Sequence, residues 1–389
     1  MTELAFALVA QGGLLALILV VMESRSPLAN RFLAGLLVAL SVSLLARALA
    51  TRGIHLRLIG TLYNATFLIG PSFYFYSRAL ANRAFRLRPG HLLHALPTLL
   101  SIVVTQSIGL DRGNVTGSLV RVVALIGLLN ASSLVVYSGA ALRLLDRYRR
   151  ALLDHYSTIE RISLGWLKVL AMIVLSSGVI IAVMNCVRLI HGLPSEANAL
   201  VVVPFSLVVF YTVAIFGFRQ SSVLLMGAGA EPAAAPPPAA DEAPPAAPES
   251  EDADEVDEAD ETAGRAAKYE RSGLDDARAR RIWSRLEQLM NTEALYLDPD
   301  LQVSALAQRL EVSPQTLSEV LGRIAGSRFY DYINRLRVER ARQLLRDAAW
   351  AERSVLEIAL AAGFNSKSTF NKYFKQEVGQ TPTAYRQVA

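Results

Sequence analysis

A polar stripe near the end of the chain has the residue types that read the edges of DNA bases. Between residues 367 and 375, the aromatic residues Phe370, Tyr373 and Phe374 recur at helical spacing and must point inward. The residues left on the outer side are Lys367, Ser368, Asn371, Lys372 and Lys375. Amide side chains pair with adenine edges, and lysine binds guanine acceptors or phosphates. The stripe predicts a helix in the major groove, although a solvated helix face is also rich in Lys and Ser.

A second stripe lies earlier in the chain. Ser313 and Pro314 predict the N-cap and the first residue of a helix. The residues that recur at spacings of three, four and seven, and so face the core, are Leu317, Val320, Leu321 and Ile324. The residues left outside, and so candidates for DNA contact, are Gln315, Ser318, Glu319, Gly322 and Arg323. Glu319 either accepts a hydrogen bond from cytosine or repels phosphate, so this face is the less certain reader.

Each stripe follows a short apolar helix and a turn, the arrangement of a helix-turn-helix motif. Ser304 is the expected N-cap of the first short helix, which ends at Leu310 before a turn at Glu311-Val312. The second short helix follows Ser354 and ends at a glycine turn, Gly363. Because two such motifs occur in series, DNA contact is favoured over the alternative that each polar stripe is only a solvated helix face.

Two further helices are expected around these motifs. The segment Phe329 to Leu345 predicts a rod between the motifs, because it is apolar on more than one side, and its arginines are placed to meet phosphates. A helix from about Asp275 to Met290 carries apolar residues at helical spacing. It either docks on the domain or pairs with a second chain, and docking is the expectation.

The strings RFYDYINRLRVERARQLL and IALAAGFNSKSTFNKYFKQEVGQTPTAYR resemble the DNA-binding domain of the AraC/XylS family of bacterial transcription regulators. The resemblance covers about residues 295 to 387. It implies two helix-turn-helix modules joined by a central helix, which present recognition helices to successive major-groove faces. By position, it assigns base reading to Gln315, Ser318, Glu319, Lys367, Ser368, Asn371 and Lys372. Glu311 departs from the family pattern, since a glycine often eases this turn.

The first half of the chain has a different composition, dominated by Leu, Val, Ile, Ala and Phe up to about residue 226. A helix needs roughly 20 apolar residues to cross a bilayer. Seven such stretches are predicted, at about 4–22, 32–50, 58–77, 91–110, 118–142, 164–190 and 198–218. The first has no cationic start and no small-residue cleavage site, so it is expected to be retained rather than removed as a signal peptide. This half resembles the multipass membrane sensors attached to some members of the same family.

Loop charge predicts the orientation. Lys and Arg favour the cytoplasmic side, and the most basic loop, between the fifth and sixth stretches, contains Arg143, Arg147, Arg149, Arg150, Arg161 and Lys168. The N-terminus is then outside and the C-terminal domain is cytoplasmic, in a bacterial inner membrane. The polar residues within or near the spans are the ligand-binding candidates: Asn64, Gln106, Asn130, Asn185 and Arg188. The favoured alternative is that they bond neighbouring helices, with Arg188 reaching the interface.

An Ala/Pro-rich and then acidic segment, residues 227–264, separates the two halves. Its composition predicts disorder. It is expected to be a spacer, while the alternative is that its acidic run competes with DNA for the basic face of the domain.

The sequence predicts an all-α protein: a seven-helix membrane bundle (1–226), a disordered linker (227–264), an amphipathic helix (265–294) and a tandem helix-turn-helix domain (295–389). Cys186 is the single cysteine, and no metal site, cofactor or enzymatic motif is recognised. The function expected is sequence-specific transcription regulation coupled to a membrane or periplasmic signal. The alternative is a membrane receptor or transporter-like protein whose C-terminal domain is an interaction module without useful DNA affinity. The partners expected are operator DNA and lipid, with RNA polymerase, a second copy of the chain and an unidentified small-molecule or membrane signal as further candidates.

Overall fold

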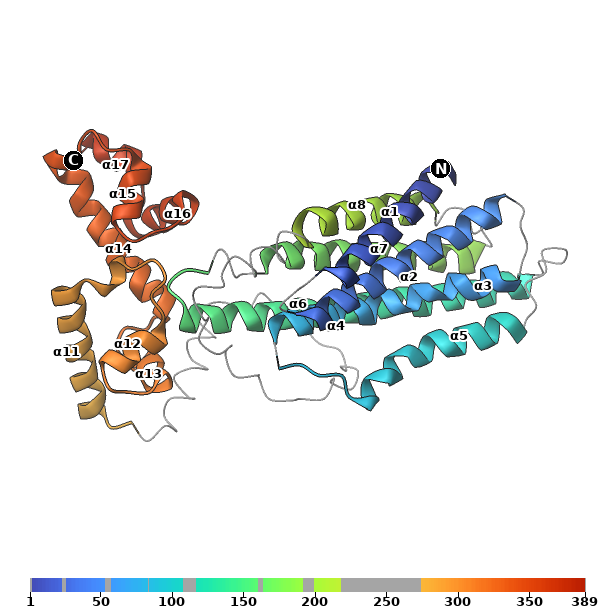
Figure 1. The fold of residues 1–389 in the computed structure, drawn as a ribbon, viewed down its shortest axis with the longest axis horizontal. Coiled ribbons are helices and arrows are strands. Elements are labelled where there is room, and N and C mark those ends of the chain that lie inside the picture. The colour runs from blue at the N-terminus through green and yellow to red at the C-terminus, as the bar shows by residue number, and fades with distance from the viewer. Residues whose placement is uncertain are drawn as a thin grey trace. The chain divides into compact units, whose positions relative to one another are not determined.

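The structure is a computed structural model that describes residues 2–22, 26–52, 57–82, 84–107, 117–159, 164–191, 199–217 and 274–388. The chain divides into two compact units, Met1–Tyr148 with Leu164–Ala235 and Arg149–Ser163 with Pro236–Ala389. In the described ranges every element longer than an isolated bridge is a helix, which confirms the all-α class (Figure 1). The predicted linker, residues 227–264, lies outside the described residues.

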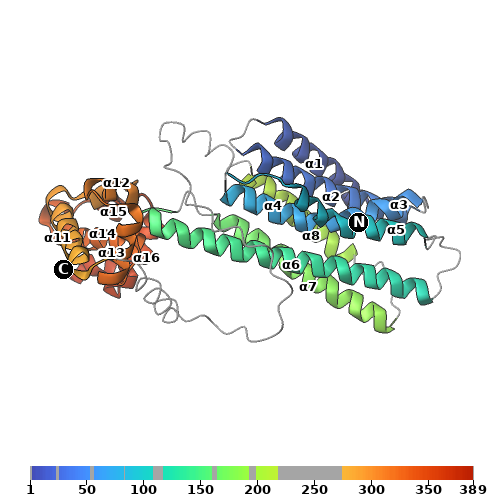
Figure 2. The same cartoon turned by 90° about the horizontal axis from the view of Figure 1, so that it is seen from below.

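The first unit is a set of helices that run alongside one another (Figure 2). In chain order the elements are α1 (Thr2–Val21), α2 (Pro27–Thr51), α3 (Arg57–Tyr63), η1 (Asn64–Leu68), α4 (Ile69–Ala81), η2 (Pro89–Ala95), α5 (Leu96–Ser107), α6 (Gly117–His155), α7 (Gly165–His191), α8 (Ala199–Thr212) and the π-helical turn η5 (Val213–Gly217). Leucines of α2, among them Leu33, Leu37, Leu40 and Leu44, are buried in its core.

Among the described residues, four helices are long and apolar enough to cross a membrane: Thr2–Val21, Pro27–Ala50, Arg121–His155 and Gly165–His191. The other three predicted stretches correspond to broken or shorter helices. A 3-10 segment, Asn64–Leu68, interrupts the third stretch. The helix in the fourth has only 12 residues and begins beside Pro97, and Pro204 lies inside the 14-residue α8. Prolines restrict helix continuation, so length supports four spans and the number seven stays a prediction.

The second unit contains two helical modules built around one shared helix. Its elements are α11 (Asp276–Glu293), η6 (Leu295–Leu297), α12 (Val303–Arg309), α13 (Pro314–Ile324), α14 (Phe329–Arg346), η7 (Ala348–Trp350), α15 (Val355–Ala361), α16 (Lys367–Val378) and α17 (Pro382–Val388). Phe329 and Ile333 of α14 join one core with α11, α12 and α13. Val338 and Leu344 of the same helix join the other core with α15, α16 and α17 (Figure 1). This confirms the predicted rod between two motifs.

The amphipathic helix before the motifs docks rather than standing free. In α11 the buried residues are Ala279, Ile282, Leu286 and Met290, which belong to the first module's core. The Trp283 ring packs on Tyr332 of α14 with the ring centroids 5.5 Å apart. This confirms the docking expectation within the chain, while pairing with a second copy stays untested.

Two local predictions were wrong. The N-cap of α12 is Gln302 instead of Ser304, because the helix begins two residues earlier than predicted, with Val303, whose side chain is buried. Ile324 is 37% exposed although its spacing predicts a core position. It is the last residue of α13, and the chain turns away from the helix at Gly326, which has φ +58°. The apolar spacing therefore includes one residue, Ile324, that no longer packs on the core.

The turns follow the predictions. Glu311 has φ +58°, a left-handed conformation that glycine adopts more easily, at the position where the family often has glycine. Gly363 has φ +90°, and an added Cβ would lie 2.8 Å from the Tyr296 carbonyl oxygen. Gly363 therefore permits both the turn of the second motif and its close approach to η6.

Candidate nucleic-acid interface

The helix that carries the first polar stripe, α16, is held by capping and by aromatic packing. The Ser366 hydroxyl accepts a hydrogen bond from the Thr369 N–H at 3.4 Å, and the helix ends at Gly379 with φ +80°. Phe370 and Phe374 have no exposed surface. These two rings fix the rotation of α16 about its axis, which decides the residues that face outward.

The outer side of α16 matches the predicted stripe. Lys367, Ser368, Asn371, Lys372 and Lys375 are all exposed. Four of them line one groove of about 500 Å³ whose complete lining is Val355, Lys367, Asn371, Lys372, Lys375, Thr381, Pro382 and Thr383. The sequence did not single out Val355 and Thr383, which reach this groove from α15 and α17. The arrangement places an amide among three ammonium groups on a convex helix face, the chemistry required for contact with base edges and phosphates.

The corresponding face of α13 is less cationic. The Ser313 hydroxyl caps the helix by accepting from the Thr316 N–H at 3.0 Å, as predicted. Gln315 is exposed, and Ser318 and Glu319 are half-buried. Arg323 is engaged by the start of α11, because its Nη1 donates to the Leu274 carbonyl oxygen at 2.8 Å and lies 3.5 Å from the Asp276 carboxylate. Since no spacing rule relates α11 to this side of α13, the sequence did not indicate that contact.

Arg337 corrects the expectation that the arginines of α14 meet phosphates. Its side chain is completely buried, with Nε donating to the Tyr296 carbonyl oxygen at 2.7 Å and Nη2 to that of Asp298 at 2.8 Å. Arg335 is exposed and lies 4.0 Å from Glu377 of α16. A buried guanidinium needs all of its donors satisfied, so Arg337 is a structural residue, while the exposed arginines stay candidates for phosphate contact.

The two modules are joined at α14. The Tyr373 hydroxyl donates to the Asp331 carboxylate at 3.0 Å, and the rings of Tyr330 and Tyr373 have centroids 5.5 Å apart. These contacts tie α16 to the half of α14 that belongs to the first module. The spacing between the two recognition faces is therefore set by one continuous helix.

Most of the five polar candidates of the first unit hydrogen-bond to neighbouring helices, and none of them lines the apolar cavity of that unit. Asn64 is buried and donates to Gly60 and Thr105, Gln106 donates to Thr61, and Asn130 donates to Thr66. On α7, the Asn185 amide donates to the Ile181 carbonyl oxygen at 2.8 Å, while its Oδ1 and the Nε of the mostly buried Arg188 have no hydrogen-bond partner. Most of these contacts are helix-to-helix hydrogen bonds, which favours the packing interpretation; a role in ligand binding stays a prediction.

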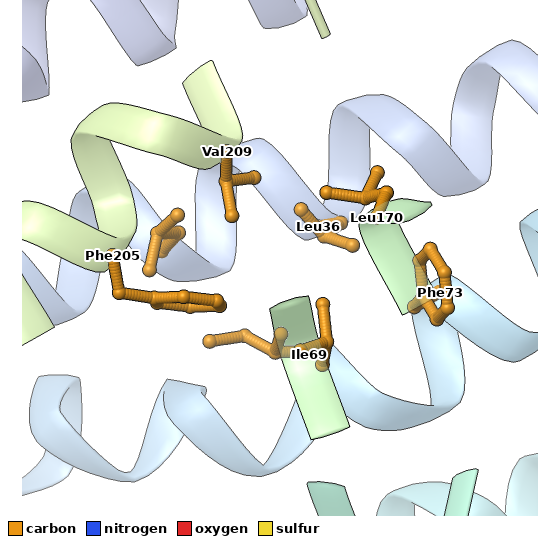
Figure 3. Close-up of a pocket in the computed structure, with 8 residues that line it drawn as sticks. Leu36, Ile69, Phe73, Leu170, Phe205 and Val209 are labelled. Carbon is orange, nitrogen blue, oxygen red and sulfur yellow. The ribbon is translucent and has the colours of Figure 1, made fainter. Parts of the chain in front are cut away.

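The small apolar cavity in the same unit also lacks polar candidates. Side chains from α2, α4, α7 and α8 line it, among them Leu36, Ile69, Phe73, Leu170, Phe205 and Val209 (Figure 3). All of its lining side chains are hydrocarbon, so it offers no group that would orient a polar ligand.

Comparison with known proteins agrees with this site. Residues 306–388 match the family model described as "Helix-turn-helix domain". The chain is 33% identical over 104 residues to the regulatory protein PocR of Salmonella typhimurium, and 29% identical over 104 residues to the melibiose operon regulatory protein of Escherichia coli K12. An uncharacterised helix-turn-helix-type transcriptional regulator of Staphylococcus aureus is 29% identical over 102 residues. No solved structure gives a significant match to the chain.

These similarities concern the C-terminal part alone. The aligned region is 27% of this chain and 33% of each of the first two relatives, and it is 26% of this chain and 13% of the staphylococcal protein. The chain thus spans about a third or less of the length of these relatives. The C-terminal part is a helix-turn-helix domain of the kind found in transcription regulators.

The capping of α15 makes a prediction about pH. The Ser354 hydroxyl accepts from the Glu357 N–H, and the Glu357 carboxylate accepts from the Ser354 N–H at 2.8 Å. The hydrogen bonds from Ser354, and then that from Arg353, lower the pKa of Glu357 to about 2. Because the folded pKa is depressed, the carboxylate stabilises the helix above its ordinary pKa, and this contribution is lost as the pH falls towards 2.

We expect Ser354→Ala to raise the pKa of Glu357 only in part, because the main-chain N–H of residue 354 still donates to the carboxylate, and to weaken the start of α15 by removing the hydroxyl that caps it. An NMR titration of the Glu357 carboxyl carbon in both proteins measures the shift. Gln288→Ala, at an exposed position of α11 in the other module, is the control. An unchanged pKa in Ser354→Ala would show that the Ser354 hydroxyl does not contribute to the depressed pKa of Glu357 in solution.

Proposed function

We propose that the chain is a membrane-anchored, sequence-specific DNA-binding transcription regulator of the AraC/XylS type, which couples a membrane or periplasmic signal to gene expression. The observation that carries the proposal is the groove on α16, where Asn371 lies with Lys367, Lys372 and Lys375. The tandem arrangement around α14 and the similarity to two named regulatory proteins support it.

Membrane anchoring is the second part of the proposal. In the part of the chain that the structure describes, four helices have the length and apolarity of membrane spans. Large apolar side chains on their surfaces are exposed, such as Leu17, Val136, Val183 and Ile190. Large exposed apolar surfaces are unfavourable in water and favourable in lipid.

The DNA-binding part is tested with the isolated fragment 265–389. Both cores of this fragment consist of its own residues, from Ala279 to Tyr385. We expect it to bind a selected operator about 10³-fold or more tightly than random DNA, with an affinity that falls steeply as salt rises. A fluorescence-anisotropy titration at several salt concentrations measures both quantities.

The alternative, a membrane receptor or transporter-like protein with a C-terminal interaction module, makes the opposite prediction for this fragment. A folded fragment without salt-dependent, sequence-selective binding would overturn the proposed function. Genome-wide mapping of the DNA bound by the full-length protein then identifies the target sites.

The topology makes a separate prediction. If the number of spans is odd and loop charge sets the orientation, reporter fusions after Gly109 and after Gly227 will report periplasmic and cytoplasmic locations respectively. A fusion after Tyr156, in the most basic loop, is expected to report the cytoplasm as well. A periplasmic signal after Gly227 would exclude direct transcriptional control by the C-terminal domain.

A further inference from the structure

A short segment from the other half of the sequence belongs to the compact unit that contains the helix-turn-helix domain. Residues 154–159 are the last two residues of α6 and the four residues after it, and they cluster with this unit. Tyr156 and Gln302 form an isolated antiparallel bridge. The Ser157 N–H donates to the Leu301 carbonyl oxygen at 3.1 Å. Main-chain pairing of this kind is the way in which an extended peptide binds beside a folded domain.

Side chains reinforce the backbone pairing. The Thr158 hydroxyl donates to the Pro299 carbonyl oxygen at 2.7 Å. Asp154 lies 3.9 Å from Nε of Arg328, whose side chain is only 11% exposed. Ile159, at the other end, is buried. The segment is thus held by an ion pair at one end, hydrogen bonds in the middle and an apolar side chain at the other end.

The centre of the contact is the buried guanidinium of Arg337. Nη1 donates to the Ser157 carbonyl oxygen and Nη2 to the Ser157 hydroxyl, both at 3.1 Å. Ser157 itself is 1% exposed. Burying a guanidinium is costly unless its donors are paired, and the segment adds two acceptors to those that Tyr296, Asp298 and Asn334 already supply.

The contact lies where a displacement would matter for DNA reading. Residues 299–302 lead directly into α12 of the first module. Arg337 stands on α14 between Ile333, in the first core, and Val338, in the second. A displacement of the segment would therefore act on the part of α14 that joins the two modules and sets the spacing between α13 and α16.

We propose that residues 154–159 are a docking strap through which a movement of α6 and α7 reaches the DNA-binding domain. Its docking surface is made of residues 298–302, Arg328 and Arg337, and its occupant is this chain's own loop. The strap lies in the loop whose basic residues predict a cytoplasmic location, the side expected for the DNA-binding domain. The role in signalling rests on the proposed function, whereas the docking itself does not.

Docking is tested by disulfide trapping in the full-length protein in native membranes. Cys186, the single cysteine, is first replaced by serine. Residues opposite each other in an antiparallel bridge have Cα atoms about 4.5 to 5.5 Å apart, within the range that a disulfide spans. We expect Tyr156→Cys with Gln302→Cys to form an intramolecular disulfide with a mild oxidant. The control pair is Tyr156→Cys with Gln288→Cys, on the exposed side of α11; equal cross-linking in the two pairs would overturn the proposal.

A second pair of variants tests the role of Arg337. Ser157→Lys places a bulky cation in a buried site against the guanidinium, and we expect it to lower the cross-linking yield about tenfold. Ser157→Ala keeps the backbone donor and acceptor, and it is expected to preserve most of the cross-link. An undiminished yield in Ser157→Lys would exclude docking through Arg337.

The signalling role has its own measurement, a transcriptional reporter driven by the operator. We expect Ser157→Lys to change reporter output about fivefold or more relative to the starting protein, the usual size of allosteric coupling, while Ser157→Ala changes it little. The signalling role would be overturned if the protein with Ser157 forms the cross-link normally and the Ser157→Lys variant still gives unchanged reporter output. Failure of the proposed function is distinguishable, because fragment 265–389 would then not bind DNA although the full-length disulfide still forms.

Discussion

Replacing Phe374 by alanine is expected to unfold the second helix-turn-helix module. The Phe374 ring has no exposed surface and lies between Phe370 and Tyr385, with ring centroids 5.4 and 5.5 Å away. Removing a buried aromatic ring lowers the free energy of unfolding by about 3 to 5 kcal/mol. Thermal unfolding of fragment 265–389, followed by circular dichroism, should show a midpoint lower by roughly 12 °C or more.

The matched control for this variant is Lys375→Ala. Lys375 is the next residue on α16 and is exposed, so its replacement is expected to leave the unfolding midpoint within a few degrees of the starting value, about the effect of an ordinary surface substitution. Equal stability of the Phe374→Ala fragment and the control would contradict the packing that orients α16.

The exposed polar face of α16 was predictable from the sequence because two local signals agree there. The aromatic spacing of Phe370, Tyr373 and Phe374 fixes the inner side, Gly363 fixes the turn, and the polar residues are what remains. Each signal acts over one or two helical turns, the range in which spacing alone determines facing. The groove that collects Lys367 and Asn371 also needs α17, whose position depends on tertiary packing.

The main-chain partners of Arg337 and Arg323 could not be predicted from the spacing of residues along a helix. On a helical wheel an arginine predicts an exposed face, yet Arg337 bonds carbonyl groups of Tyr296, Asp298 and Ser157. These partners are distant in the sequence, and carbonyl oxygens are present in every residue, so no residue type marks them. Arg323 is similar, because it binds the main chain at Leu274.

In the first half of the chain, composition predicts the apolar stretches but not whether each stretch forms one continuous helix. Hydropathy identifies apolar stretches, but Pro97 and the 3-10 turn at Asn64–Leu68 decide whether a stretch is one continuous helix. The described part of α5, 12 residues and about 18 Å, is shorter than the roughly 30 Å of hydrocarbon, and residues 108–116 after it lie outside the described residues. Polar residues such as Asn64 likewise found partners on neighbouring segments, a result that depends on packing rather than on residue type.

The prediction that decides the function concerns Asn371 and its neighbours in the groove. Asn371 and Lys367 stand one turn apart on the exposed side of α16 and line the same groove. Asn371→Ala is expected to weaken binding to the preferred operator by about 1 to 3 kcal/mol, which is roughly 5- to 150-fold, with little change on random DNA. The reason is that an amide paired with one base edge contributes to discrimination and little to the non-specific electrostatic attraction.

Lys375→Ala, further along the same helix, separates phosphate contact from base reading. We expect it to weaken binding to all sequences alike and to lower the salt slope by about one, because one fewer counterion is released. Anisotropy titrations of both variants against the operator and a scrambled duplex, at several salt concentrations, measure the two effects. Because Phe370 and Phe374 hold α16 from the opposite side, neither substitution disturbs its packing. If Asn371→Ala and Lys367→Ala both kept full affinity and selectivity in a folded fragment, α16 would not be the base reader, and the groove would have to serve a different partner.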